Sequence, residues 1–177
     1  MAATSEELDR VDRKILKLLQ ERGRMSNVEL SRHVNLSPAP CLARVKRLER
    51  RGFIRGYHAD LDPKKLGLNL LAYVEVTLSS SAPKTLEAFS RAIRAIPEIE
   101  ECHMVAGRCD YLVKLRCADM EAYRRLLIDS ISTNSLVAQT NTHMVIQEVK
   151  STNELAIESA TGGKPVRHQH KRSPATT

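Results

Sequence analysis

The residues of this sequence best suited to binding chemistry lie between positions 37 and 51. This stretch carries five cationic side chains and a single acid, Glu49. An arginine guanidinium can donate two parallel hydrogen bonds to the edge of a guanine or to a phosphate. The small side chains of Ala39 and Ala43 allow close approach and can contact a thymine methyl group. The stretch therefore predicts a helix that enters the major groove of duplex DNA.

The candidate DNA contacts divide by the role that their positions favour. Arg44 or Arg47 could read a guanine or clamp a phosphate. Arg50, Arg51 and Arg55 are better placed for phosphates, which fix position without reading sequence. The full candidate set is Ser26, Asn27, Ser37, Pro38, Ala39, Pro40, Ala43, Arg44, Lys46, Arg47, Arg50, Arg51 and Arg55. The competing interpretation is a basic, solvated helix that has no ligand.

Other kinds of chemistry have little support. The four cysteines, Cys41, Cys102, Cys109 and Cys117, form no Cys-x-x-Cys pair, so we expect reduced thiols and no metal site. We find no nucleophile–base pair, metal-ligand cluster or phosphate-cradling glycine loop, and therefore expect no enzyme. Because the chain has two Phe, four Tyr and no Trp, stacking on single-stranded bases is disfavoured. Duplex DNA is the expected nucleic acid.

Two helices are expected before the basic stretch. Apolar residues recur at three- and four-residue steps over 8–19, which predicts a first helix that ends near Gly23. Ser26 and Glu29 have the spacing of a capping box, in which the serine hydroxyl accepts a backbone N–H of the first helical turn. The second helix is short and ends by Val34.

A very tight connection separates the second helix from the third. Asn35 tolerates the left-handed backbone conformation with which helices often end. Ser37 suits an N-cap and Pro38 suits the first helical position, while Gly52 suits the end of the helix. Two short helices joined by so short a turn cross steeply, as in a helix-turn-helix. An extended segment over 52–59 follows.

From about residue 70 the apolar pattern changes from a helical period to alternation. The order β-α-β-β-α-β is that of a ferredoxin-like domain, with a four-stranded antiparallel sheet and two helices on one face. Because the strands are apolar on both sides, we expect a partner to cover the open face. The expected elements are a strand over 70–78, a helix over 84–96, two strands around a turn at 107–110, a helix capped by Asp119, and a strand over 137–149.

Charge divides the chain along the same lines. Residues 1–60 hold 13 Lys and Arg against 8 Asp and Glu, whereas residues 61–150 hold 11 of each. A basic first third joined to a neutral middle indicates two modules with different partners. We therefore expect a DNA-binding domain over 1–60, a linker over 61–69, a second domain over 70–155, and a disordered basic tail over 156–177.

Nothing in the sequence predicts membrane insertion or secretion. No run of 18 apolar residues occurs, and the polar N-terminus "MAATSEELDR" lacks the apolar core of a signal peptide. We expect a cytoplasmic protein, associated with the nucleoid if it binds DNA.

The two patterned regions resemble one known family. "LDRVDRKILKLLQERGRMSNVELSRHVNLSPAPCLARVKRLERRGFIRGY" and "ECHMVAGRCDYLVKLRCADMEAYRRLL" are similar to the two domains of Lrp/AsnC, or feast/famine, transcriptional regulators. The resemblance covers roughly residues 8–155. It implies an α+β protein in which a winged helix-turn-helix precedes a ferredoxin-like βαββαβ (RAM/ACT-like) domain. It also implies homo-oligomers, from dimers up to octamers, that bind amino acids between dimers.

The sequence departs from this family at both sites. Where the family commonly has Gly-Asp-aromatic-Asp, this chain has Gly107, Arg108, Cys109 and Asp110, and Ser135-Leu136-Val137 replaces Pro-Gly-Val. In the third helix, Ala39 and Ala43 replace the Thr and Glu of the members it most resembles. Loss of an acid near phosphates predicts a shifted site preference and stronger non-specific binding.

The resemblance implies that an amino-acid effector binds near the turn. Such a ligand needs an acceptor for its ammonium, a donor for its carboxylate and a wall for its side chain. Asp110 could be the acceptor and Arg108 the donor, although Asp110 could instead satisfy backbone amides and Arg108 could be merely exposed. The candidate effector residues are Met104, Val105, Ala106, Gly107, Arg108 and Asp110. Leucine or another amino acid is the expected ligand, and no other cofactor is expected.

The leading hypothesis is therefore a sequence-specific, DNA-binding transcriptional regulator controlled by an amino acid. The alternative is an amino-acid-sensing regulatory subunit that binds an enzyme, with the basic N-terminus as a docking arm. The capped helix pair argues against that alternative. RNA binding on the sheet is disfavoured, because the charge lies in the other domain and the strands lack exposed aromatics.

Overall fold

The computed structural model describes residues 8–132 and 134–157, which fall into two units. The first unit contains the chain up to Ala59 together with the segment from Thr152, and the second runs from Asp60 to Ser151. The tail expected to be disordered lies outside the described residues from position 158 onwards.

The first unit is built from three helices, as the sequence predicts. Its elements are α1 (Arg10–Glu21), α2 (Asn27–His33) and α3 (Pro38–Arg50). The apolar stripes of the three helices meet in one core, where Ile15, Cys41 and Leu48 have no exposed surface. Leu42 lies at the edge of the apolar stripe of α3 and is 42% exposed.

Local chemistry sets the ends of these helices. The Ser26 hydroxyl accepts a hydrogen bond from the Glu29 N–H, so the expected serine cap of α2 forms. Asn35 has φ 55°, the left-handed conformation expected for the turn, and Gly52 has φ 75° after α3. Ser37 occupies the N-cap position of α3, but its side chain makes no capping hydrogen bond.

The chain that follows α3 contains no β-strand between residues 53 and 69, all of which the structure describes. Ile54 packs against the three-helix core, and the Tyr57 hydroxyl donates a hydrogen bond to Glu49 at 3.0 Å. At the other end of the chain, the amide of Gln20 pairs with both backbone polar groups of Leu155. These bonds attach the segment from Thr152 to α1.

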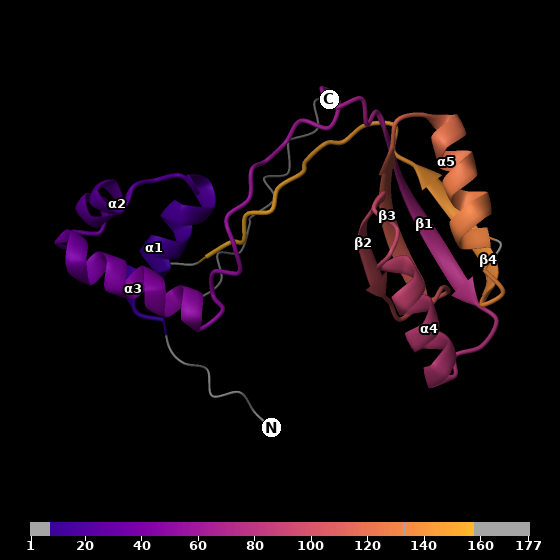
Figure 1. The fold of residues 1–177 in the computed structure, drawn as a ribbon, viewed down its shortest axis with the longest axis horizontal. Helices are drawn as coiled ribbons and strands as arrows, with labels where there is room; N and C mark the ends of the chain where they lie inside the picture. Colours follow the sequence, from indigo (N-terminus) through magenta and orange to yellow (C-terminus); the bar gives the residue numbers. More distant parts are fainter. Residues whose placement is uncertain (1–7, 133, 158–177) are drawn as a thin grey trace, which may run out of the picture. The chain divides into compact units, whose positions relative to one another are not determined.

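The second unit has the expected ferredoxin-like topology. Its strands lie in the order β2-β3-β1-β4, and all three neighbouring pairs are antiparallel. In Figure 1 the helices α4 and α5 lie on one side of this sheet. The elements are β1 (Leu70–Leu78), α4 (Pro83–Ile93), β2 (Ile99–Met104), β3 (Tyr111–Cys117), α5 (Met120–Leu126), a π-helix (Leu127–Ser132) and β4 (Val137–Met144).

The core of this unit lies between the sheet and its helices. Alternate residues of β1 and β3 face the helices and are buried, including Val74 and Val113. Phe89 of α4 is fully buried, and its ring lies 4.7 Å from that of Tyr111. Asp119 caps α5 through the Ala122 N–H, and Met120, at the first helical position, is 57% exposed.

The open face of the sheet differs from the expectation that both faces are apolar. Alternation places polar and charged side chains there on all four strands. Lys114 of β3 pairs with both Glu100 and Glu101 of β2, and His143 of β4 lies 3.3 Å from Glu75 of β1. The prediction was wrong because alternate positions of β2 and β4 carry polar residues, so only one face is apolar.

Candidate nucleic-acid interface and effector loop

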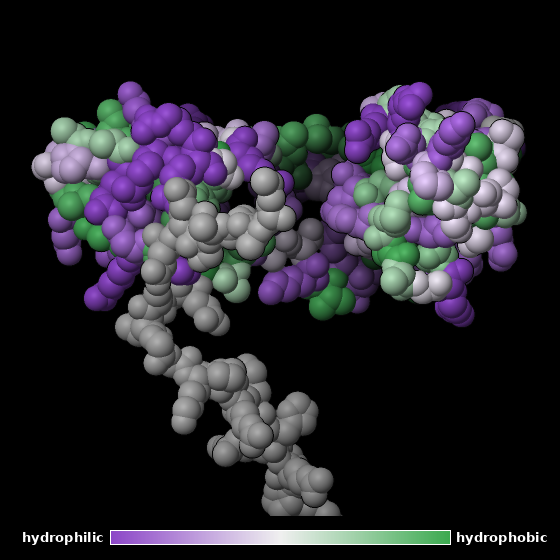
Figure 2. Space-filling view, turned by 90° about the horizontal axis from the view of Figure 1, so that it is seen from below, coloured by the Kyte–Doolittle hydropathy of each residue, from purple (hydrophilic) through white to green (hydrophobic). Residues whose placement is uncertain are grey.

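The exposed face of α3 is a cationic surface with two small residues. Ala39, Ala43, Lys46 and Arg50 recur at three- and four-residue steps, so they share one face of the helix, and all four are exposed. Figure 2 views the first unit from the side on which α3 lies in Figure 1, and hydrophilic residues gather on that side. Ser37, Pro38 and Pro40 are also exposed at the N-terminal end of the helix.

Arg44 and Arg47 point toward α1 instead. Asp12 of α1 is 2% exposed, and both of its carboxylate oxygens are bound by these two arginines. Arg44 Nη1 lies 2.9 Å from Asp12 Oδ1, and it also binds Asp9. Arg47 Nη2 lies 2.7 Å from Asp12 Oδ2. The cluster links α3 to α1 through four charged side chains.

The charges of this cluster stabilise one another. Hydrogen bonds to Asp9 and then to Asp12 raise the pKa of Arg44 above its usual value. Partial burial acts to raise the pKa of Asp9, but the Asp12 N–H and the Arg44 guanidinium outweigh it, so that pKa is lowered. Burial raises the pKa of the neighbouring Cys41 thiol despite the charge of Arg44. This thiol is therefore a packing group and not a nucleophile.

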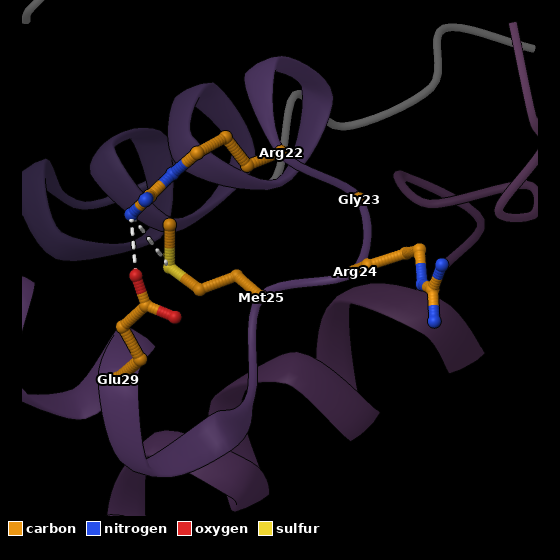
Figure 3. A pocket seen from close by; sticks show the side chains of 5 residues that line it. All are labelled: Arg22, Gly23, Arg24, Met25 and Glu29. Atoms are coloured by element: carbon orange, nitrogen blue, oxygen red, sulfur yellow. Dashed lines mark hydrogen bonds and ion pairs between the residues drawn. The ribbon is translucent and has the colours of Figure 1, made fainter.

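The turn between α1 and α2 is closed by side chains around a shallow depression. Figure 3 shows that Arg22 extends past Met25 to Glu29, with 2.8 Å between Arg22 Nη2 and Glu29 Oε1, while Arg24 points away. Glu29 thus binds Arg22 while the Ser26 hydroxyl caps α2. These contacts fix the N-terminal end of α2.

The remaining candidate DNA-contact residues lie at the ends of the helices. Asn27 Nδ2 donates to the Pro38 carbonyl at 2.8 Å, which links the start of α2 to the start of α3. The guanidinium of Arg51 lies 5.0 Å from the centre of the Phe53 ring. Arg55 is exposed in the segment after α3.

The effector candidates lie on the β2–β3 turn of the second unit. The Val105 N–H donates to the Asp110 carbonyl, and the Asp110 N–H donates to the Val76 carbonyl, both at 3.0 Å. The half-buried Asp110 carboxylate accepts the N–H of Leu78 at 2.7 Å through Oδ2. Asp110 therefore satisfies a backbone amide at the end of β1, which joins this turn to the centre of the sheet.

The other turn residues face solvent to differing degrees. Ala106, Gly107 and Arg108 are exposed to solvent, and Met104 is 60% exposed. Hydrogen bonds from Asn141 and His143, and more weakly the charge of Arg108, lower the pKa of Glu75. An anionic group of the open sheet face therefore lies within the field of Arg108.

The described residues offer neither a cluster of metal ligands nor a membrane-spanning helix. Among residues 8–132 and 134–157 no group of three or more His, Cys, Asp or Glu side chains is arranged to hold a metal ion. Within the same ranges no helix is both long and apolar enough to cross a membrane.

A helix-turn-helix with a cationic outer helix, followed by a ferredoxin-like domain, defines a two-domain DNA-binding regulator. Comparison with known proteins supports this class domain by domain. Residues 8–55 match the winged helix-turn-helix DNA-binding family, and residues 71–155 match the Lrp/AsnC ligand binding domain. The chain belongs to the Lrp/AsnC family of transcriptional regulators, a class of DNA-binding proteins and not of enzymes.

Individual relatives span nearly the whole described chain. The leucine-responsive regulatory protein of Escherichia coli K12 is 52% identical over 153 residues, which cover 86% of this chain and 93% of that protein. A Neisseria meningitidis transcriptional regulator solved as its L-Met complex is 39% identical, with a TM-score of 0.81 over 84% of this chain and 96% of its own. Escherichia coli AsnC is 26% identical, with a TM-score of 0.78 over 84% and 98%.

Sequence reasoning missed the role of Asp12. A signal was present, because Asp12 lies four residues after Leu8 and three before Ile15, within the apolar stripe of the first helix. A carboxylate in a buried stripe requires cationic partners. The surplus of arginines on the third helix supplies them, so part of the basic character expected to face DNA faces the protein.

Proposed function

We propose that this protein binds specific sites on duplex DNA as a dimer or larger homo-oligomer. The observation that carries the proposal is the exposed cationic face of α3, with Ala39 and Ala43 beside Lys46 and Arg50. A major groove admits one such helix, and the N-terminal half of a recognition helix reaches base edges. A dimer would read two half-sites about 34 Å apart or a multiple of that distance.

The proposed DNA-binding surface includes the ends of α2 and α3 as well as this face. Ser26 and Asn27 lie at the start of α2, and Ser37 lies at the start of α3 with its hydroxyl not used in a cap. Backbone N–H groups and small polar side chains at such positions suit phosphates. Arg50 and Arg51 at the end of α3, and Arg55 in the segment after it, would bind phosphates on the other side of the groove.

We infer that the second domain binds an amino-acid effector near the β2–β3 turn. The Neisseria meningitidis relative was solved with L-Met, and the Escherichia coli relative is named as leucine-responsive, so both amino acids are candidates here. Asp110 would accept the ammonium through the carboxylate oxygen not bound to Leu78, and Arg108 would donate to the carboxylate. The proposed site comprises Met104, Val105, Ala106, Gly107, Arg108 and Asp110.

The proposed mechanism is linkage between effector, assembly and DNA. An effector that binds one assembly state more tightly shifts the population toward it, and the affinity for DNA follows. An octamer could bend or wrap DNA. On this proposal the protein acts in the cytoplasm at the nucleoid, with residues 1–60 on DNA, 61–69 as linker, 70–155 as the assembly and effector domain, and 156–177 as a tail.

A regulatory subunit that binds an enzyme is not favoured. Residues 8–55 match a DNA-binding family, and a subunit that binds only an enzyme would have no use for a DNA-binding domain.

The first test is a gel-shift assay with the protein's own promoter region, excess competitor DNA and single amino acids as additives. We expect a competitor-resistant band that responds to leucine, methionine or another amino acid. Specific binding that no amino acid alters would refute the effector part alone. If the folded protein retards no DNA, the regulator proposal fails. Sedimentation at matched concentrations tests whether the effector changes the assembly state.

A further inference from the structure

The buried carboxylate of Asp12 constrains two of the arginines on α3. Its 2% exposure leaves almost no access to water, so its negative charge depends on the guanidinium groups of Arg44 and Arg47. Removing the partners of a buried charge is strongly unfavourable. Both arginines are therefore held against α1 in the folded unit.

This arrangement restricts how the same side chains can reach the edge of a base. Reading a guanine requires a guanidinium to direct two N–H groups at the base edge. In Arg44 one terminal nitrogen already binds both Asp9 and Asp12, and in Arg47 one terminal nitrogen spans both oxygens of Asp12. If either side chain turned outward, the buried Asp12 carboxylate would lose one of its two arginine partners.

Lys46 has the opposite surroundings. It is exposed, it lies one helical turn from Ala43, and no ion pair is recorded for it among the described residues. A lysine ammonium can donate to the O6 and N7 acceptors of guanine. Arg50 shares the face but lies at the C-terminal end of α3, where contacts to phosphate are expected.

We propose that the basic residues of α3 have two distinct roles in DNA recognition. Arg44 and Arg47 are positioning residues that act through Asp12 to fix the rotation of α3 on α1. Lys46 is the cationic side chain that sets sequence preference in the major groove, between Ala43 and Arg50. This inference rests on the DNA-binding function proposed above.

The test of Lys46 uses the full-length protein and the best site that wild type selects from a random DNA pool. Fluorescence anisotropy would measure affinity for that site and for each of its single-base variants. Lys46→Ala should abolish discrimination at one base pair, a loss of roughly 5- to 150-fold, because a good base contact is worth about 1–3 kcal/mol. Lys17→Ala removes the same charge from an exposed position of α1 and should leave every base preference unchanged.

The test of the positioning role is a double-mutant cycle. Arg44→Ala should reduce discrimination across several base pairs in the wild-type background and have little further effect in an Asp12→Asn background. Arg44→Lys, which keeps a cation for Asp12, should restore part of the discrimination. The slope of affinity against salt should stay unchanged, since no phosphate contact is lost. Circular dichroism confirms that each variant is folded at the assay temperature.

The outcomes separate this inference from the function on which it rests. If Arg44→Ala lowers affinity equally in both backgrounds and reduces the salt slope by about one, Arg44 contacts DNA directly and the inference is overturned. It is also overturned if Lys46→Ala keeps every base preference of wild type. A wild-type protein that selects no site from the pool would instead refute the proposed function itself.

Discussion

Asp110 has two candidate roles that one pair of substitutions can separate. Its carboxylate accepts the Leu78 N–H at 2.7 Å, and it is also the proposed acceptor for the ammonium of the effector. Asp110→Asn keeps an oxygen that can accept the Leu78 N–H but removes the negative charge. Asp110→Ala removes both. The two variants should therefore agree in effector binding and differ in stability.

The magnitudes follow from the surroundings of the Leu78 N–H. Leu78 is 6% exposed, so its amide gains little from water when the carboxylate is removed. An unsatisfied buried donor costs about 1–3 kcal/mol, so Asp110→Ala should lose that much unfolding free energy. Asp110→Asn should lose less than about 1 kcal/mol, the difference between a charged and a neutral acceptor. Loss of the ammonium contact should weaken effector binding roughly 10- to 150-fold in both variants.

Urea unfolding and isothermal titration with leucine and methionine measure the two effects separately. Glu87→Gln, which neutralises an exposed acid on α4, is the control and should change neither. If Asp110→Asn destabilises the protein as much as Asp110→Ala, the acceptor role assigned to Oδ2 is wrong. If Asp110→Asn binds the effector with wild-type affinity, the charge of Asp110 has no part in ammonium recognition.

Three further substitutions test the two units independently. Phe89→Ala should lower unfolding free energy by about 3–5 kcal/mol in urea unfolding, because the ring is fully buried between α4 and the sheet; a loss below 1 kcal/mol would contradict that packing. Ser26→Ala should cost about 1 kcal/mol through loss of the α2 cap, measured by thermal unfolding; Ser37→Ala, which removes a hydroxyl that makes no capping hydrogen bond, is the control and should cost less. Hydrogen bonds from His103 and then Lys114 lower the pKa of Glu101 from 4.5. The charged carboxylate therefore stabilises the fold above pH 4.5, and this stabilisation is lost as the pH falls through the pKa of Glu101 in the folded protein. Glu101→Gln should thus lower the melting temperature slightly at pH 7 and not at pH 3, and an equal difference at both pH values would count against the ion pair.

Local signals in the sequence predict most of the first unit. The positions of Ser26, Asn35 and Gly52 identify the helix ends because each acts on its own backbone: a hydroxyl that accepts an N–H, and two residues that tolerate positive φ. The rotation of α3 about its axis is a different matter. It depends on which residues α1 presents, and the partners Asp12 and Arg44 are 32 residues apart in the chain.

The second unit shows the same division between local and long-range information. Alternation in β1 predicts the strand to the residue, because period-two burial is a property of the segment itself. The contact of Asp110 with Leu78 joins the turn after β2 to the end of β1, and only the pairing of β1 with β3 brings those residues together. One carboxylate oxygen of Asp110 is therefore already bound to a backbone N–H, a contact that the sequence motif alone does not reveal.

Asp12 and Asp110 both show that a charged residue in this chain can be engaged within the protein and not by a ligand. Each is an acidic residue whose carboxylate has partners inside its own unit. The arginines that bind Asp12 were expected to contact DNA, and the Leu78 N–H that binds Asp110 competes with the proposed effector for the carboxylate. The number of cationic residues on α3 overstates the positive charge available to DNA, because Arg44 and Arg47 neutralise the buried Asp12 carboxylate. The affinity of this surface for phosphate should accordingly depend on Arg50, Arg51 and Arg55 more than on Arg44 and Arg47. Exposure and partner, and not residue type, decide which charges are available for recognition.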